Sequence, residues 1–90
     1  MDIQIDHQPS LEKMKAMGVF GWPIWVKEPS EFPWAYAQSE TCYIIEGRFS
    51  VVPDGGAPVE VVAGDLVTFP AGLNCTWKIS KKVRKHYQFS

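Results

Sequence analysis

From residue 41 onward, short apolar runs alternate with clusters of Gly, Pro and Asp, a pattern typical of β-strands joined by tight turns. The strongest run covers residues 41–45 and ends at Glu46 and Gly47. Residues 48–52 continue this strand after a kink. The other predicted strands are residues 59–62, 66–69, 75–80 and 83–89, with turns at 53–56, 63–65 and 70–72. This spacing predicts an all-β sandwich or barrel, which also removes exposed sheet edges.

The N-terminal third combines weak strand signals with one short helix. Residues 1–5 alternate apolar and polar side chains, which indicates a short edge strand. Ser10 precedes helix-forming residues at 11–17 and a glycine follows them, so we predict a helix of about two turns with an N-cap and a stop. Residues 19–26 are rich in aromatic side chains, but Pro23 restricts them to an edge strand or a bulge.

The composition is that of one small folded unit. The 90 residues are 46% apolar and include four Trp, three Tyr and five Phe, enough for a modest core. We therefore predict a single domain over residues 1–90, with residues 1–32 forming the N-terminal strands and helix and residues 33–90 forming the barrel. The net charge of −1 provides no global field that would recruit nucleic acid or an anionic membrane.

Charge is nevertheless distributed unevenly along the chain. Residues 1–65 hold all ten acidic residues and four basic ones, a net −6, while residues 66–90 hold five basic residues and no acidic one, a net +5. In one interpretation the basic end packs against the acidic strands or is solvated. In the other it contacts an anionic ligand, and the residues concerned are Lys81, Lys82, Arg84 and Lys85.

Two features of the sequence bear on the cellular location of the protein. No apolar run approaches the roughly 18 residues of a membrane span, and the first residues lack the basic and apolar regions of a signal peptide. Cys42 and Cys75, without an export signal, are interpreted as reduced thiols rather than a disulfide. We therefore expect a cytoplasmic protein.

Two stretches resemble a known family. Glu40 and Gly47, with six residues between them, are similar to the end of the first cupin motif. Residues 64–75 follow the spacing of the second motif, Gly-x5-Pro-x-Gly-x2-His, with Cys75 in the place of the His. The chain is thus identified as a small cupin.

Flanking residues resemble a narrower branch of that family. Residues 22–25 and 83–87 look like those of the compact single-domain cupins grouped with (S)-ureidoglycine aminohydrolases. The resemblance implies an RmlC-like jelly-roll barrel of two facing antiparallel sheets, with a short N-terminal helix and a pocket at one mouth of the barrel.

The metal ligands of the family are largely missing. Cupin metal sites use a His-x-His pair, the motif Glu and the second-motif His, and the corresponding residues here are Trp34, Tyr36, Glu40 and Cys75. Glu40 and Cys75 alone supply fewer ligands than a catalytic zinc site has. We therefore predict no cofactor, and a divalent transition metal only if His86 completes the set with Glu40 and Cys75.

The candidate site follows from strand alternation, because alternate side chains on a strand share one face. If the ligand positions face inward, as the resemblance implies, they line one cavity, although aromatic core packing would produce the same pattern. Glu40 and Cys75 are the catalytic candidates. The ligand-binding candidates are Trp34, Tyr36, Glu40, Cys42, Cys75, Trp77, Lys85 and His86. Arg84 and His86 share a face opposite Lys85, and the sequence leaves open which face meets the cavity.

Three functional classes follow. A carboxylate with aromatic walls suits a small neutral or cationic nitrogen ligand, so we expect a small-molecule-binding protein that acts on or senses a ureido or amino metabolite without the standard metal. The alternatives are a metal-dependent ureidoglycine aminohydrolase-like hydrolase, with the enzyme question undecided, and a structural protein. A homodimer is expected in each case, because the small core does not readily hide four N-terminal aromatic residues: Phe20, Trp22, Trp25 and Phe32.

Overall fold

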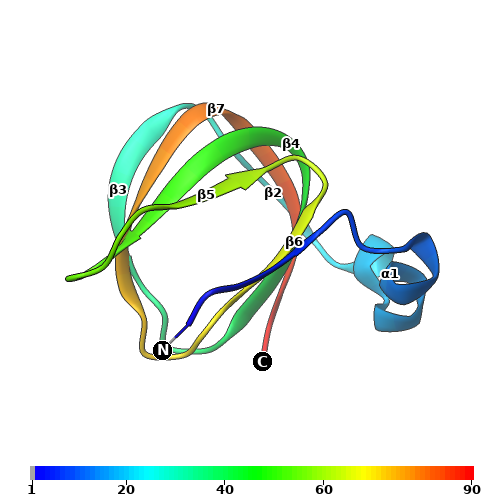
Figure 1. Ribbon diagram of the computed structural model, residues 1–90. Coiled ribbons are helices and arrows are strands. Elements are labelled where there is room, and N and C mark those ends of the chain that lie inside the picture. Colours follow the sequence, from blue (N-terminus) through cyan, green and yellow to red (C-terminus); the bar gives the residue numbers. More distant parts are fainter. Residues whose placement is uncertain (1) are drawn as a thin grey trace.

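The computed structural model describes residues 2–90, so Met1, which belongs to the first predicted strand, lies outside the described residues. The elements in chain order are β1 (Gln4–His7), α1 (Leu11–Met17), the 3-10 helix η1 (Val19–Gly21), β2 (Ile24–Lys27), β3 (Ser30–Ala35), β4 (Glu40–Pro53), β5 (Val59–Val62), β6 (Asp65–Phe69) and β7 (Asn74–Phe89). The strands curl around a central space and α1 lies outside them (Figure 1).

The strands form one antiparallel sheet rather than two facing sheets. Their order is β1-β6-β4-β7-β2, with β3 pairing with β7 and β5 pairing with β4. The expectation of two separate sheets is corrected because β4 and β7 pair along their lengths and therefore pass through both halves of the curl. Among the described residues the end strands β1 and β2 do not pair with each other, so the barrel is not closed (Figure 1).

The predicted kink within one long strand is confirmed, because residues 41–45 and 48–52 both belong to β4, with register shifts between Ile44 and Phe49. Residues 75–80 and 83–89, predicted as two strands, both belong to β7. The aromatic-rich segment 19–26 divides into the short helix η1 and the strand β2.

Gly47 makes the bend in β4. Its φ is +109°, and a Cβ at this position would lie 2.4 Å from a carbonyl oxygen of β7. Only glycine tolerates so close an approach. The register shifts here also reverse the alternation of buried side chains, from Cys42 and Ile44 before the bend to Phe49 and Val51 after it. Both halves of β4 therefore face the same core.

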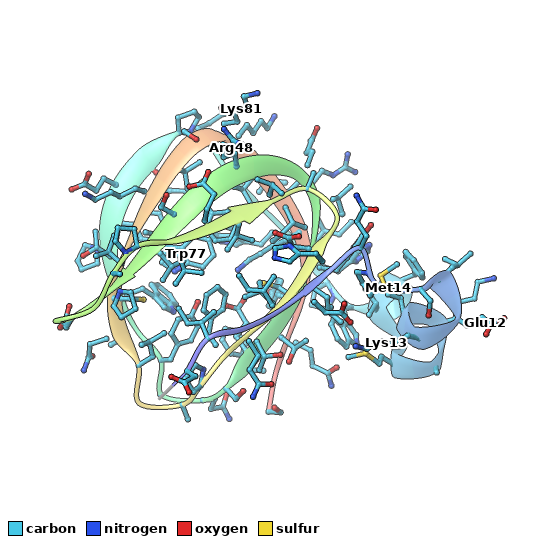
Figure 2. All side chains as sticks on the ribbon, viewed as in Figure 1. Glu12, Lys13, Met14, Arg48, Trp77 and Lys81 are labelled. Atoms are coloured by element: carbon cyan, nitrogen blue, oxygen red, sulfur yellow. The ribbon has the colours of Figure 1, made fainter. Side chains whose placement is uncertain are left out.

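The core fills the inside of the curled sheet. It contains large aromatic side chains that stack on one another, with the rings of Phe49 and Trp77 4.2 Å apart and inclined by 7°. The other buried members are Tyr36, Cys42, Ile44, Val51, Val61, Val67, Phe69, Leu73, Cys75, Ile79 and Val83. Figure 2 shows Trp77 inside the curl, where this core meets the candidate site.

The predicted N-terminal helix is confirmed. The Ser10 side chain accepts a hydrogen bond from the backbone N–H of Lys13 at 3.1 Å, and Gly18 ends the helix with φ +76°. Met14 is buried in a second, smaller cluster with Val19 and Leu66. The helix α1 that carries Met14 lies outside the curled strands (Figure 1). No helix within residues 2–90 is long and apolar enough to cross a membrane.

Candidate functional site

A cavity of about 210 Å³ opens beside the core, between strands that are distant in sequence. Its wall is aromatic apart from one carboxylate and one ammonium group. The lining residues are Trp25, Phe32, Trp34, Tyr36, Glu40, Trp77, Lys85, Tyr87 and Phe89. They come from β2, β3, β4 and β7 and from the residue that follows β3. The structure thus brings five of the eight predicted ligand-binding residues to one cavity.

Strand pairing explains how the cavity wall is assembled. In the registers that join β7 to β2 and β3, Lys85 stands opposite Trp25 and Trp77 stands opposite Phe32. These partners are far apart in the chain, so neighbouring strands supply one continuous aromatic wall. On β7 the alternation that places Lys85 in the cavity also places Tyr87 there.

Glu40 is buried, and each of its two carboxylate oxygens accepts a hydrogen bond. One carboxylate oxygen, Oε1, accepts a hydrogen bond from the Tyr36 hydroxyl at 2.8 Å, and the other, Oε2, accepts one from Lys85 Nζ at 2.7 Å. Glu40 and Lys85 are only 3% and 4% exposed. A buried charge is stable only with such partners, so the three side chains form one polar unit in an otherwise apolar cavity.

The Lys85 ammonium also contacts two indole rings. Its Nζ lies 4.7 Å from the centre of the Trp25 ring and 4.6 Å from the centre of the Trp77 ring. Aromatic faces are electron-rich and stabilise a cation at this distance. Trp77 carries a further polar group, because its indole N–H is buried and has no hydrogen-bond partner among the described residues.

The Tyr36 phenol is held in its neutral, hydrogen-donating form. Burial raises the pKa of Tyr36 well above its usual value, and the negative charge of Glu40 and the hydrogen bond to it raise the pKa further. Tyr36 therefore remains a donor to Glu40 across the physiological pH range. It orients the carboxylate rather than competing with it for a proton.

The two cysteines lie outside the cavity lining. Burial raises the pKa of Cys42 to about 12, with Lys85 opposing the shift and Glu40 adding to it. Burial, Asp54 and Glu40 together raise the pKa of Cys75, whose Sγ lies 3.6 Å from the Trp34 carbonyl oxygen. Both groups therefore rest as neutral thiols at neutral pH, the form that does not act as a nucleophile.

His86 occupies the opposite face of β7 from Lys85. Its Nδ1 lies 2.9 Å from the Trp22 carbonyl oxygen, and its ring packs edge-on against Phe20. The structure therefore answers the question that the sequence left open: Lys85 faces the cavity and His86 does not. The ligand-binding role proposed for His86 in this cavity is corrected accordingly.

The residues present do not fit a cupin metal site. Within residues 2–90, no three His, Cys, Asp or Glu side chains are close enough together to hold a metal ion. The set of Glu40, Cys75 and His86 is not assembled, because His86 points away. Glu40 has Lys85, a cation, as its partner, so an incoming metal ion would have to displace a buried ammonium group.

The basic C-terminal segment and the N-terminal aromatic residues each contribute some side chains to the cavity and leave others on the surface. Of the basic C-terminal residues, Lys85 enters the cavity while Lys82 is exposed and lies 3.6 Å from Glu28. Trp25 and Phe32, expected at a dimer interface, line the cavity instead. Phe20 remains 48% exposed, and the homodimer stays a prediction.

Sequence reasoning missed four of the lining residues: Trp25, Phe32, Tyr87 and Phe89. The alternation on β7 that starts from Lys85 would have identified the last two, once the orientation of that strand was known. Trp25 and Phe32 carried no comparable signal, because their strands reach the cavity only through pairing with β7.

Comparison with known proteins agrees with this architecture. The sequence model of the EutQ-like cupin domain matches residues 14–87. The crystal structure of a DUF861 family protein from Thermotoga maritima is 48% identical, with a TM-score of 0.95, and the match covers 99% of this chain and 100% of that one. No protein with a curated description matches the chain significantly.

More distant structures share the fold alone. A putative ethanolamine utilization protein Q from Salmonella typhimurium is 24% identical with a TM-score of 0.67, over 73% of this chain and 53% of that chain. The present chain thus spans about half of that protein. An RmlC-like cupin from Shewanella frigidimarina is 22% identical with a TM-score of 0.57, over 74% and 65% of the two chains. With the family match, the curled antiparallel sheet and both motifs in place, the chain belongs to the EutQ-like cupin family.

Proposed function

We propose that the protein binds a small, uncharged ligand with a ureido or amide group in the aromatic cavity. The observation that carries this proposal is the buried unit of Tyr36, Glu40 and Lys85 at the cavity wall. Each group in it retains unused hydrogen-bonding capacity. A lysine ammonium has three N–H donors, of which one goes to Glu40, and each carboxylate oxygen has a second lone pair.

A ureido group matches this capacity. Its N–H groups would donate to Glu40 while its carbonyl oxygen accepts from Lys85, and its flat face would pack against the aromatic side chains of the cavity wall. The cavity of about 210 Å³ is smaller than a typical drug-sized site, so the ligand has few heavy atoms.

The charges of the cavity disfavour two related classes of ligand, namely cations and carboxylates. Glu40 and Lys85 already neutralise each other, so an uncharged ligand adds no net charge to an apolar cavity. A guanidinium or ammonium ligand would compete with Lys85 for the carboxylate, and the earlier expectation of a cationic ligand is withdrawn for this reason. A carboxylate ligand would leave a surplus negative charge beside Glu40, which is unfavourable at low dielectric.

Binding is preferred to hydrolysis within the same ligand class. The resemblance of the flanking segments to ureidoglycine aminohydrolase-like cupins supports a ureido ligand, but the chemistry of a hydrolase needs an activated nucleophile or a metal-bound water. Cys75 does not meet the first requirement, since its pKa is raised. The donor set around Glu40 does not meet the second.

The test is calorimetry and thermal unfolding with phenylurea and methylurea, compared with guanidinium and benzoate. We expect the ureas alone to bind, with a stabilisation of about 2.7 kcal/mol at a hundredfold excess over the dissociation constant. Glu40→Gln should weaken urea binding at least about tenfold, whereas the matched change Glu46→Gln, at an exposed position of the same strand, should leave it unchanged.

Two results would contradict the proposal. One is equal binding of phenylurea by the wild type and Glu40→Gln. The other is stronger binding of guanidinium than of urea. If Glu40→Gln does not fold, the double variant Glu40→Gln with Lys85→Met removes both charges together and still lacks the carboxylate, so the same comparison remains available.

A further inference from the structure

Lys85 has a chemical property that reversible ligand binding does not use. It is a primary amine at the wall of an aromatic cavity, only 4% exposed, with a carboxylate oxygen 2.7 Å away. Buried lysines next to an acid–base group are the amines that form covalent adducts with carbonyl compounds. The six other lysines of the chain are all exposed: Lys13, Lys15, Lys27, Lys78, Lys81 and Lys82.

We propose that Lys85 forms an imine with small, uncharged aldehydes that enter the cavity, with Glu40 moving the protons. The proposal needs three elements in one place, and the cavity contains them: the amine, a proton carrier in direct contact with it, and an apolar space for the aldehyde side chain. It concerns the same cavity as the proposed function but does not depend on a ureido ligand.

The reaction is balanced by the groups present. The Lys85 ammonium gives one proton to Glu40, and the resulting amine attacks the aldehyde carbon while the C=O π bond opens. A proton moves from nitrogen to oxygen, which gives a neutral carbinolamine. Glu40 then returns its proton to the hydroxyl group, the C–O bond breaks, and water leaves as the C=N bond forms. An ammonium and an aldehyde become an iminium and water, and Glu40 ends as a carboxylate.

The first step has a direct path, because Lys85 Nζ lies 2.7 Å from Glu40 Oε2 and the proton moves along an existing hydrogen bond. Tyr36 donates to the other oxygen of Glu40 and holds the carboxyl group in position during the transfer. Tyr36 is therefore a positioning residue.

The iminium product fits the site as well as the Lys85 ammonium of the resting structure does. The iminium keeps a positive charge between the rings of Trp25 and Trp77 and beside the Glu40 carboxylate, where the ammonium lies in the resting structure. The aldehyde side chain occupies aromatic space that would otherwise hold water. An imine on an exposed lysine has neither advantage and is open to hydrolysis by solvent.

The experiment is reductive trapping with benzaldehyde and sodium cyanoborohydride, followed by intact mass and peptide mapping. The six exposed lysines are internal controls in the same molecule. We expect the first benzyl group on Lys85, at a rate at least about tenfold above the mean of the exposed lysines. Pyrenecarboxaldehyde, which is too large for the cavity, should label only exposed lysines. The inference is overturned if benzaldehyde labels the exposed lysines and leaves Lys85 unmodified.

Variants test the role of the carboxylate. Glu40→Gln should slow labelling of Lys85 by at least about 100-fold, the usual contribution of a general acid–base, while Glu46→Gln should leave the rate unchanged. Tyr36→Phe keeps the carboxylate and should cause a smaller loss, confined to Lys85, while the labelling rates of the exposed lysines in the same molecule stay unchanged. Equal labelling of Lys85 in the wild type and Glu40→Gln would refute the proton-carrier role.

The outcome separates this inference from the proposed function. Labelling of Lys85 without phenylurea binding would leave the covalent chemistry standing and refute the ureido ligand. Phenylurea binding with an unreactive Lys85 would support the ureido ligand and refute the covalent chemistry. Lys85→Arg completes the comparison, because it keeps a cation near Glu40 but cannot form an imine, so the rapid first benzylation should disappear.

Discussion

The ion pair between Glu40 and Lys85 allows a quantitative test of how the cavity is built. Replacing Lys85 with Met removes the ammonium but nearly keeps the length of the side chain. Glu40, 3% exposed, then retains only the hydrogen bond from Tyr36. Breaking a buried ion pair by removing one partner costs about 3–5 kcal/mol, because the remaining charge is left uncompensated.

Two further contributions offset each other only in part. The lost contacts of the ammonium with two indole rings are worth about 0.5–2 kcal/mol each, and the thioether of Met regains about 0.3–1.5 kcal/mol on the same rings. We therefore expect Lys85→Met to lower the free energy of unfolding by at least about 3–5 kcal/mol, a large share of the 5–15 kcal/mol of a typical domain.

The assay is urea unfolding at neutral pH, followed by tryptophan fluorescence. The double variant Glu40→Gln with Lys85→Met should recover most of the loss, since both charges are removed and Gln still accepts from Tyr36. The control Lys78→Met, at an exposed position of β7, should change stability by less than about 0.5 kcal/mol. If Lys85→Met behaves like Lys78→Met, the pair is not buried as described and the reasoning about the cavity fails.

Three further predictions concern the bend, the thiols and the outer face. Gly47→Ala should lower the free energy of unfolding, measured in urea, by more than about 3 kcal/mol, because its Cβ meets a backbone carbonyl oxygen at 2.4 Å. The control Gly55→Ala has open space around it and should cost only about 1–2 kcal/mol. Stability should fall as pH rises from about 9 to 12, because the unfolded chain releases the Cys42 proton that the folded chain retains; the contribution of Cys42 to the slope is about 1.4 kcal/mol per pH unit, and the slope should be shallower by that amount in Cys42→Ala. The expected homodimer would use the outer face of β2, where Ile24 and Val26 are 47% and 49% exposed. Replacing both residues with Lys should then yield a monomer in sedimentation. An unchanged oligomeric state would exclude that face.

The site shows where sequence reasoning stops. The motif spacing identified Glu40 and the positions of the missing ligands, and two of those positions, Trp34 and Tyr36, line the cavity together with Glu40. Strand alternation could not identify the partner of Glu40. Lys85 lies 45 positions away, and which face of its strand points inward depends on pairing with β4.

The sequence by itself determined the local features of this protein. Ser10 and Gly18 set the ends of the helix, and the Gly and Pro residues set the turns, because these depend on backbone angles and nearby hydrogen bonds. The cupin motifs likewise indicated the family.

Only the tertiary structure decided how those parts combine. It joined the two strands predicted at residues 75–80 and 83–89 into β7, made one curled sheet in place of two, and reversed the alternation of buried residues at Gly47. It also placed Lys85 rather than His86 beside Glu40. The physical reason is that strand periodicity says which side chains share a face, whereas the direction of that face is set by non-local pairing, which no short stretch of sequence contains.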